Sequence, residues 1–242
     1  MFTPLPLWLS AAILGSALLS TALTWSGVYR LARGLSAYST RSTAAPWPVG
    51  LFLVGWLAVA IALSLQGFFQ ATSATQIPPI AYGLLPPLLV GALGLAAAPT
   101  FRRIVDITPP HWIIGVHVLR LVGVVFLILY AQQRLPAVFA LPAGVGDALV
   151  GSTAPIVAYL WFVRHRWARP LAIVWNVLGL VDLFLAVTLG VLSAPGPLQL
   201  LAHDTPNTLI TAFPLVVIPT FLVPLWVLLH VYSLRGVLKV TR

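Results

Sequence analysis

Seven polar or aromatic residues lie inside stretches that are otherwise apolar, and they are the residues that could bind a ligand or an ion. In chain order they are His117, Arg120, Asp147, Trp175, Asn176, Asp182 and His230. Arg120 lies near the middle of the apolar run 111–134, where an arginine costs about 3 kcal/mol on insertion scales. Such a charge rarely faces lipid, so we expect neighbouring helices to surround Arg120 and an acidic side chain to pair with it.

Asp182 is the partner that we expect for Arg120. Both residues lie on expected spans that run in the same direction, and a rise of 1.5 Å per residue places them at depths that differ by about 6 Å. By the same count Asp147 lies nearer to the outer face. One arginine and two aspartates leave a surplus carboxyl, which is either protonated or held by polar backbone and water. Three roles stay open for these groups: a structural ion pair, a site for an anionic ligand or an ion, and a proton relay.

The two histidines form a second candidate site. The same count of residues places His117, Asn176 and His230 at a similar depth, nearer to the cytoplasmic side. His117 and Arg120 are three residues apart and share one side of their helix. We expect His117, Trp175, Asn176 and His230 to line a cytoplasmic approach to Arg120. Two histidines on different helices could also ligate a haem iron, but we favour a role as a buried hydrogen-bonding residue for each, and the sequence identifies no cofactor.

Signatures of catalysis and of metal binding are missing from the chain. It has no cysteine, so thiolate ligands, disulfides and cysteine nucleophiles are excluded. It lacks the HExxH, GxxxxGK and GxSxG patterns of common hydrolases and nucleotide-binding enzymes. We therefore expect no catalytic residue and no metal site, and we favour a protein that is not an enzyme.

The composition predicts an integral membrane protein with a single domain. Of the 242 residues, 60% are hydrophobic and only 7% are charged, whereas soluble domains are about one quarter charged. The mean hydropathy is +1.02. The net charge of +9 does not indicate nucleic-acid binding, because the basic residues are dispersed between apolar spans.

We expect an all-α bundle of seven membrane-spanning helices, since an apolar run of roughly 20 residues crosses the hydrocarbon core. The expected spans are residues 6–29, 48–70, 79–100, 112–133, 137–163, 170–193 and 208–234. The fifth is long and begins LPAVFALPAGVGD. Proline removes a helical hydrogen bond and glycine loosens the following turn, so we predict that the helix is broken or strongly kinked between Pro142 and Gly146.

Loop charges predict the orientation. Eleven positive charges fall in alternate loops and the C-terminal tail, and one falls on the opposite side. The eleven are Arg30, Arg33, Arg41, Arg102, Arg103, Arg164, Arg166, Arg169, Arg235, Lys239 and Arg242, and the one is Arg134. The positive-inside rule then places the N-terminus outside and the C-terminus in the cytoplasm. Short loops without added domains favour a bacterial-type inner (plasma) membrane.

This topology resembles that of the rhodopsins, but in topology only. Rhodopsins hold retinal through a lysine in the last helix, whereas Lys239 is expected in the tail, so a retinal Schiff base is not expected. The leading hypothesis is a protein of the lipid bilayer that binds or transports a small molecule or ion, such as a small anion. The polar site would lie among the fourth, fifth, sixth and seventh spans. The alternative is an accessory or assembly subunit that binds partner membrane proteins. An intramembrane redox protein or enzyme, with haem held by His117 and His230, ranks third.

Overall fold

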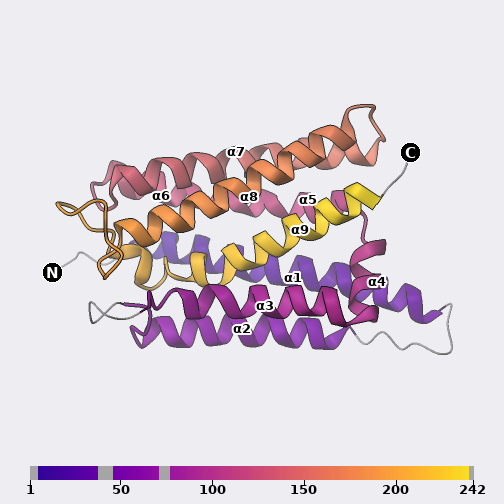
Figure 1. Ribbon diagram of the computed structural model, residues 1–242, viewed down its shortest axis with the longest axis horizontal. Coiled ribbons are helices and arrows are strands. Elements are labelled where there is room, and N and C mark those ends of the chain that lie inside the picture. The colour runs from indigo at the N-terminus through magenta and orange to yellow at the C-terminus, as the bar shows by residue number, and fades with distance from the viewer. Residues whose placement is uncertain (1–4, 38–45, 71–76, 240–242) are drawn as a thin grey trace.

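The computed structural model describes residues 5–37, 46–70 and 77–239, and the described ranges contain helices but no β-strand (Figure 1). The helices are α1 (Leu7–Ala37), α2 (Trp47–Leu65), α3 (Ala81–Ala97), α4 (Pro99–Ile107), α5 (Pro110–Val116), α6 (Val124–Ala131), α7 (Ala137–Phe162), α8 (Ala168–Ser193) and α9 (Val223–Lys239). Three short segments have other windings. They are the 3₁₀-helices η1 (His117–Gly123) and η2 (Leu209–Thr211) and the π-helix η3 (Ile218–Leu222).

The helix α9 lies between two groups of helices (Figure 1). The helices α5, α7 and α8 form one group, in which α7 packs along α8 and along η1. The helices α1, α2 and α3 form the other group, and α9 contacts α3 on this side and α5 and α8 on the opposite side. Most of α9 is buried, including Trp226 in its first turn. The bundle is therefore assembled around its last helix.

Several helices are long and apolar enough to cross a membrane. Six continuous helical segments meet both conditions within the described residues: residues 7–34, 47–65, 110–131, 137–162, 168–193 and 218–239. The expected third span differs from a simple crossing, because α3 ends at Ala97 and α4 turns away from it by 95°. Pro99 begins α4, and a proline disfavours helical backbone at the residue before it, so the chain bends here.

Two of the expected spans are less regular than the sequence indicated. The span expected at 112–133 consists of α5, η1 and α6, with seven residues of 3₁₀-helix at its centre. The span expected at 208–234 consists of η2, η3 and α9. In addition, Lys239 is the last residue of α9 and not part of a tail, and its ammonium group pairs with Asp106. A buried Schiff base at this exposed lysine has no support in the geometry.

The helix is not broken between Pro142 and Gly146, so that part of the prediction is wrong. The helix α7 runs without a break from Ala137 to Phe162 and includes Pro142. The glycines serve close packing instead of flexibility. A Cβ atom on Gly144 would lie 2.6 Å from Leu127, and a Cβ atom on Gly146 would overlap the carboxylate of Asp182. Neighbouring helices therefore press against α7 at the glycines and hold it in regular form.

Most of the basic residues belong to helices and loops that meet at one end of the bundle, which we call the basic end (right in Figure 1). It comprises Arg30, Arg33, Arg102, Arg103, Arg164, Arg166, Arg169, Arg235 and Lys239. Arg134 belongs to the loop at the opposite end, and Arg41 and Arg242 lie outside the described residues. The helix α4 crosses the basic end, where Asp106 pairs with Arg235 and Lys239. The hydrogen bond from Arg235 is the main cause that lowers the pKa of Asp106 below its usual value.

Candidate functional site

Arg120 is fully buried and its guanidinium group is enclosed by internal acceptors. Its Nε donates to Asp147 Oδ1 at 2.8 Å, and its Nη2 donates to Asp182 Oδ2. Its Nη1 lies 3.2 Å from the carbonyl oxygen of Gly179 and 3.1 Å from His230 Nε2. We call Arg120, Asp147, Asp182, Asn176, His230 and His117 the polar network. Such a charge is tolerated away from water only because these acceptors replace its hydration.

Local backbone structure brings both carboxylates to Arg120. Arg120 lies in the middle of η1, and side chains three residues apart eclipse in a 3₁₀-helix, so His117 and Arg120 point the same way. Glycines create the space beside it. A Cβ atom on Gly123 would overlap Asp147, and one on Gly146 would overlap Asp182. The carboxylates therefore lie where α7 approaches η1 and α8 without side chains in between.

A chain of hydrogen bonds extends the polar network from Arg120 along α8 and α9. Since the guanidinium donates to His230 Nε2, that nitrogen is the acceptor and Nδ1 carries the proton. His230 Nδ1 then donates to Asn176 Oδ1 at 3.0 Å. The amide nitrogen of Asn176 donates to the carbonyl of Ala172 and to Ser233 Oγ. Each member thus has a defined donor or acceptor role, which fixes the orientation of α8 against α9.

His117 joins the network by stacking. Its ring lies 3.8 Å from the ring of His230, centroid to centroid, with 27° between the two planes. Neither of its ring nitrogens has a hydrogen-bond partner within the described residues, although the side chain is fully buried. Two rings stacked face to face leave no position for an iron between their nitrogens. The pair therefore does not fit the haem ligation that the sequence raised.

Two tryptophans complete the surroundings of the network. Trp175 packs edge-on against His117 and donates a hydrogen bond from its indole nitrogen to Thr153 at 3.0 Å. Trp226 lies under the guanidinium of Arg120, with 5.8 Å from Cζ to the ring centroid, a cation–π arrangement. Trp226, the carbonyl of Gly179 and Ser233 were not expected at this site. No pattern in the sequence points to them, because an apolar residue, a backbone oxygen and a small hydroxyl are common on every span.

All seven residues singled out in the sequence meet in this region. The pairing of Arg120 with Asp182 is confirmed, and Asp147 is a second partner of Arg120. The structure also joins His230 directly to Arg120, so the two expected layers form one network. His117, Trp175, Asn176 and His230 are buried and packed together, whereas we expected them to line an approach to Arg120. Ligand or ion binding by these seven residues stays a prediction.

A cavity of about 430 Å³ lies on the other side of α9, and we call it the apolar cavity. It is lined by α1, α2, α3, α4, α5 and α9 and is open on one side, and its lining is almost wholly apolar. Among its lining residues are Phe52, Val90, Phe101, Trp112, Leu228 and Tyr232. The helix α9 has one face on each site. Leu225 and Leu229 line the cavity, while Trp226 and His230 on another face contact Arg120 of the polar network. The two sites thus share one helix as a common wall.

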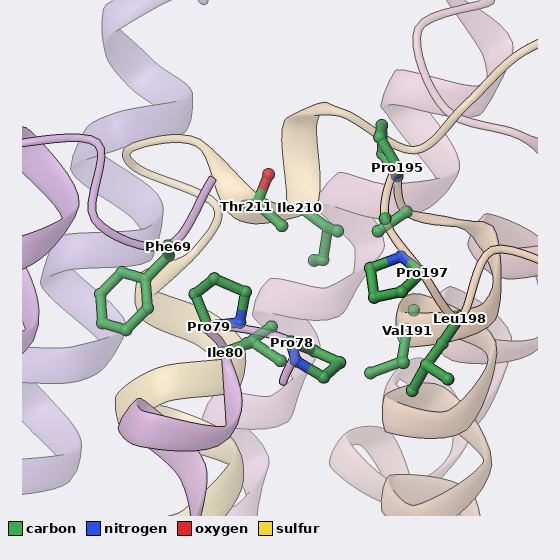
Figure 2. A pocket seen from close by; sticks show the side chains of 13 residues that line it. Phe69, Pro78, Pro79, Ile80, Val191, Pro195, Pro197, Leu198, Ile210 and Thr211 are labelled. Atoms are coloured by element: carbon green, nitrogen blue, oxygen red, sulfur yellow. The ribbon is translucent and has the colours of Figure 1, made fainter. Parts of the chain in front are cut away.

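A small gap lies at the end of the bundle opposite the basic end, between the residues that precede α3 and the residues that follow α8 (Figure 2). Pro78, Pro79, Pro195 and Pro197 are among the side chains around it, and Figure 2 shows how they converge. Its volume is about 30 Å³, which is the share of one water molecule in liquid water. This gap is a packing defect between two proline-rich connections and is too small for an organic ligand.

The fold and the network define a class: an all-helical protein of membrane-spanning length with a charged cluster buried among its helices. The chain belongs to the family described as "Domain of unknown function (DUF8737)", whose model matches residues 77–238. The match covers the whole polar network and begins just before α3, so α1 and α2 precede it. The comparisons with curated proteins and with solved structures find no match.

Proposed function

We propose that the protein resides in a membrane and binds a small apolar molecule in the apolar cavity. The cavity itself is the observation that supports this proposal. Its volume of about 430 Å³ falls in the range of ligand pockets, which are roughly 300–1,000 Å³. Such pockets are mainly apolar with few polar groups, and this cavity follows that pattern.

The lining determines the chemical class of the ligand. Among the residues that the structure describes, no charged side chain lines the cavity, so an ionised ligand would lose its hydration without a partner. The polar side-chain groups are the hydroxyls of Thr24, Thr100, Thr108 and Tyr232 and the indole of Trp112. Two of them already donate within the protein, Tyr232 to the carbonyl of Gly91 and Thr108 to that of Ile104. We infer an uncharged chain-like or ring hydrocarbon with at most one polar group.

The polar network supports a structural role better than a role as the ligand site. An anion that bound Arg120 would have to displace Asp147, Asp182 or His230, each of which already accepts from the guanidinium. Leaving a buried carboxylate without its partner costs roughly 3–5 kcal/mol. We therefore assign the network to holding η1, α7, α8 and α9 together, and we place the ligand in the apolar cavity.

The membrane topology is part of the proposal. With α3 and α4 counted as one bent crossing, the described residues hold seven candidate spans. Gathering of the basic residues at one end favours a cytoplasmic position for that end and for the C-terminus, with the N-terminus outside. We propose a multi-pass protein of the inner (plasma) membrane with this orientation, and reporter fusions at the C-terminus test it.

The test of ligand binding fills the cavity from α2. Val49→Trp adds an indole to the lining, while Leu51→Trp adds the same group on the outer surface of α2, where Leu51 is 65% exposed. In lipid nanodiscs a long-chain alcohol that carries a diazirine is photo-crosslinked to the protein, and labelled peptides are mapped by mass spectrometry. We expect saturable labelling of Phe52 and Tyr232 that Val49→Trp abolishes and Leu51→Trp preserves. Labelling that never saturates, or that both variants preserve, would refute the proposal.

A further inference from the structure

A second large cavity, of about 540 Å³, lies at the basic end, and we call it the arginine cavity. It opens between the start of α5, the end of α7 and the start of α8. Pro109, His111, Trp161, Phe162, Arg164 and Arg169 line it. None of these residues belongs to the polar network or to the apolar cavity, so this site is independent of the proposed function.

The arginine cavity carries two positive charges and its lining includes no acidic residue. Within the part of the chain that the structure describes, the guanidinium of Arg164 forms no ion pair. Arg169 donates one hydrogen bond, at 3.3 Å, to the carbonyl oxygen of Leu238, and a neutral carbonyl does not balance its charge. Arginine presents a planar fork of donors that matches the oxygens of a phosphate group. The cavity is therefore suited to an anion with several oxygens.

The backbone position of Arg164 supports this reading. The helix α7 ends in a Schellman motif, in which the Arg164 N–H donates to Trp161 and the His165 N–H donates to Leu160. Arg164 holds the left-handed position of that motif, with φ of 53°. Glycine is the residue that adopts this conformation without strain, and α2 ends in the same motif with Gly67 at that position. The chain keeps an arginine at a site that favours glycine, as it keeps Gln133 at the end of α6, and at the end of α7 the side chain concerned lines the cavity.

We propose that the arginine cavity binds the phosphate group of an anionic phospholipid. The two arginines would hold the phosphate. The aromatic rings beside them, Trp161 and the largely exposed Phe162, would lie against the upper part of the acyl chains. Tryptophan and other amphipathic rings concentrate at the level of lipid headgroups. A free phosphate compound could also bind the two arginines, but it has no acyl chain to contact Trp161 and Phe162. Binding of a phospholipid and binding of free phosphate can therefore be distinguished by experiment.

Three variants test this site. Arg164→Gly removes the charge and relieves the left-handed backbone. Gln133→Gly relieves the same backbone conformation at the end of α6, where Gln133 has φ of 57°, far from the arginine cavity. Arg166→Gln removes a charge from the same loop at a residue that does not line the cavity and whose guanidinium lies over Trp167. Binding is measured with a phosphatidylglycerol that carries a fluorophore on one acyl chain, titrated against each purified protein in detergent.

We expect Arg164→Gly to weaken phosphatidylglycerol binding about fivefold, since each basic side chain near a membrane surface contributes roughly that factor. The melting temperature of this variant should equal or exceed that of the wild type. Gln133→Gly and Arg166→Gln should bind within a factor of two of the wild type. Equal weakening by Arg164→Gly and Arg166→Gln would overturn the proposal, because it would show only diffuse charge attraction. Displacement by inorganic phosphate as effective as by unlabelled phosphatidylglycerol, or equal binding of phosphatidylcholine, would overturn it as well.

Discussion

The strongest prediction concerns the removal of Arg120 from the polar network. Arg120→Met keeps most of the side-chain length but deletes the guanidinium group. This change leaves the carboxylates of Asp147 and Asp182 without their donor, together with the carbonyl of Gly179 and the ring of His230. Removing one partner from a buried pair costs roughly 3–5 kcal/mol. For a chain of this size that loss lowers the melting temperature by roughly 6–20 °C.

The relative stabilities of three variants distinguish the effect of unbalanced buried charge from a simple loss of contacts. Asp182→Leu leaves Arg120 paired with Asp147, so the loss should be near 1.5–3 kcal/mol, about the value of one hydrogen bond to a charged group. Since Asp147 also contacts Arg120, replacing only Arg120 and Asp182 would still leave one buried carboxylate unpaired. Only the triple variant Arg120→Met, Asp147→Leu, Asp182→Leu removes every charge, and it should recover much of the loss.

Thermal unfolding of the purified protein in one detergent measures this series. Arg235→Gln is the matched control, because it breaks an arginine–aspartate pair that is partly exposed at the basic end. An exposed pair contributes at most about 1 kcal/mol, so this variant should melt close to the wild type. The reasoning fails if Arg120→Met melts within about 2 °C of the wild type, or if the triple variant is no more stable than Arg120→Met alone.

Two further predictions concern a glycine and the basic end. Gly146→Ala should destabilise the protein by about 1–3 kcal/mol in the same assay, because its Cβ would overlap Asp182. The control Gly55→Ala has no neighbouring atom within 4 Å of the new Cβ, so it should be neutral or stabilising. Equal effects of the two substitutions would contradict the packing role of Gly146. Because the folded-state pKa of Asp106 is lowered below 3.8, its pairing with Arg235 stabilises the fold above pH 3.8 and that contribution is lost as the pH falls further. The difference in melting temperature between wild type and Asp106→Asn should therefore shrink in acid, and a constant difference would contradict it.

The sequence predicted the long apolar helices and the pairing of Arg120 with Asp182 because both follow from strong energetic constraints. A buried charge needs a partner at its own depth, and the helical rise fixes that depth. Helix winding was not predictable in the same way. The residues of η1 around Arg120 are nearly all apolar, so no periodicity distinguishes three residues per turn from 3.6. The unbroken α7 was missed because Pro142 and its glycines act through the neighbours that pack on them.

The apolar cavity was also beyond the reach of sequence reasoning. Its lining comes from six helices, and each contributes ordinary apolar residues that would fit equally well against lipid or in a filled core. The arginine cavity could be predicted from the sequence only in part. Arg164 and Arg169 were read as loop charges that orient the protein, and only the backbone conformation of Arg164 shows that one of them occupies a position suited to glycine.

The winding of η1 has a mechanical consequence. A 3₁₀-helix turns about 120° and rises about 2.0 Å per residue, whereas an α-helix turns about 100° and rises 1.5 Å. If the seven residues of η1 rewound into an α-helix, α6 would rotate relative to α5 by roughly 140° and move about 3.5 Å closer to it. The motion would combine rotation about the helix axis with translation along it, and Arg120 is the middle residue of the segment that would rewind. The hydrogen bonds from Arg120 to Asp147 and Asp182 therefore oppose any rewinding of this segment.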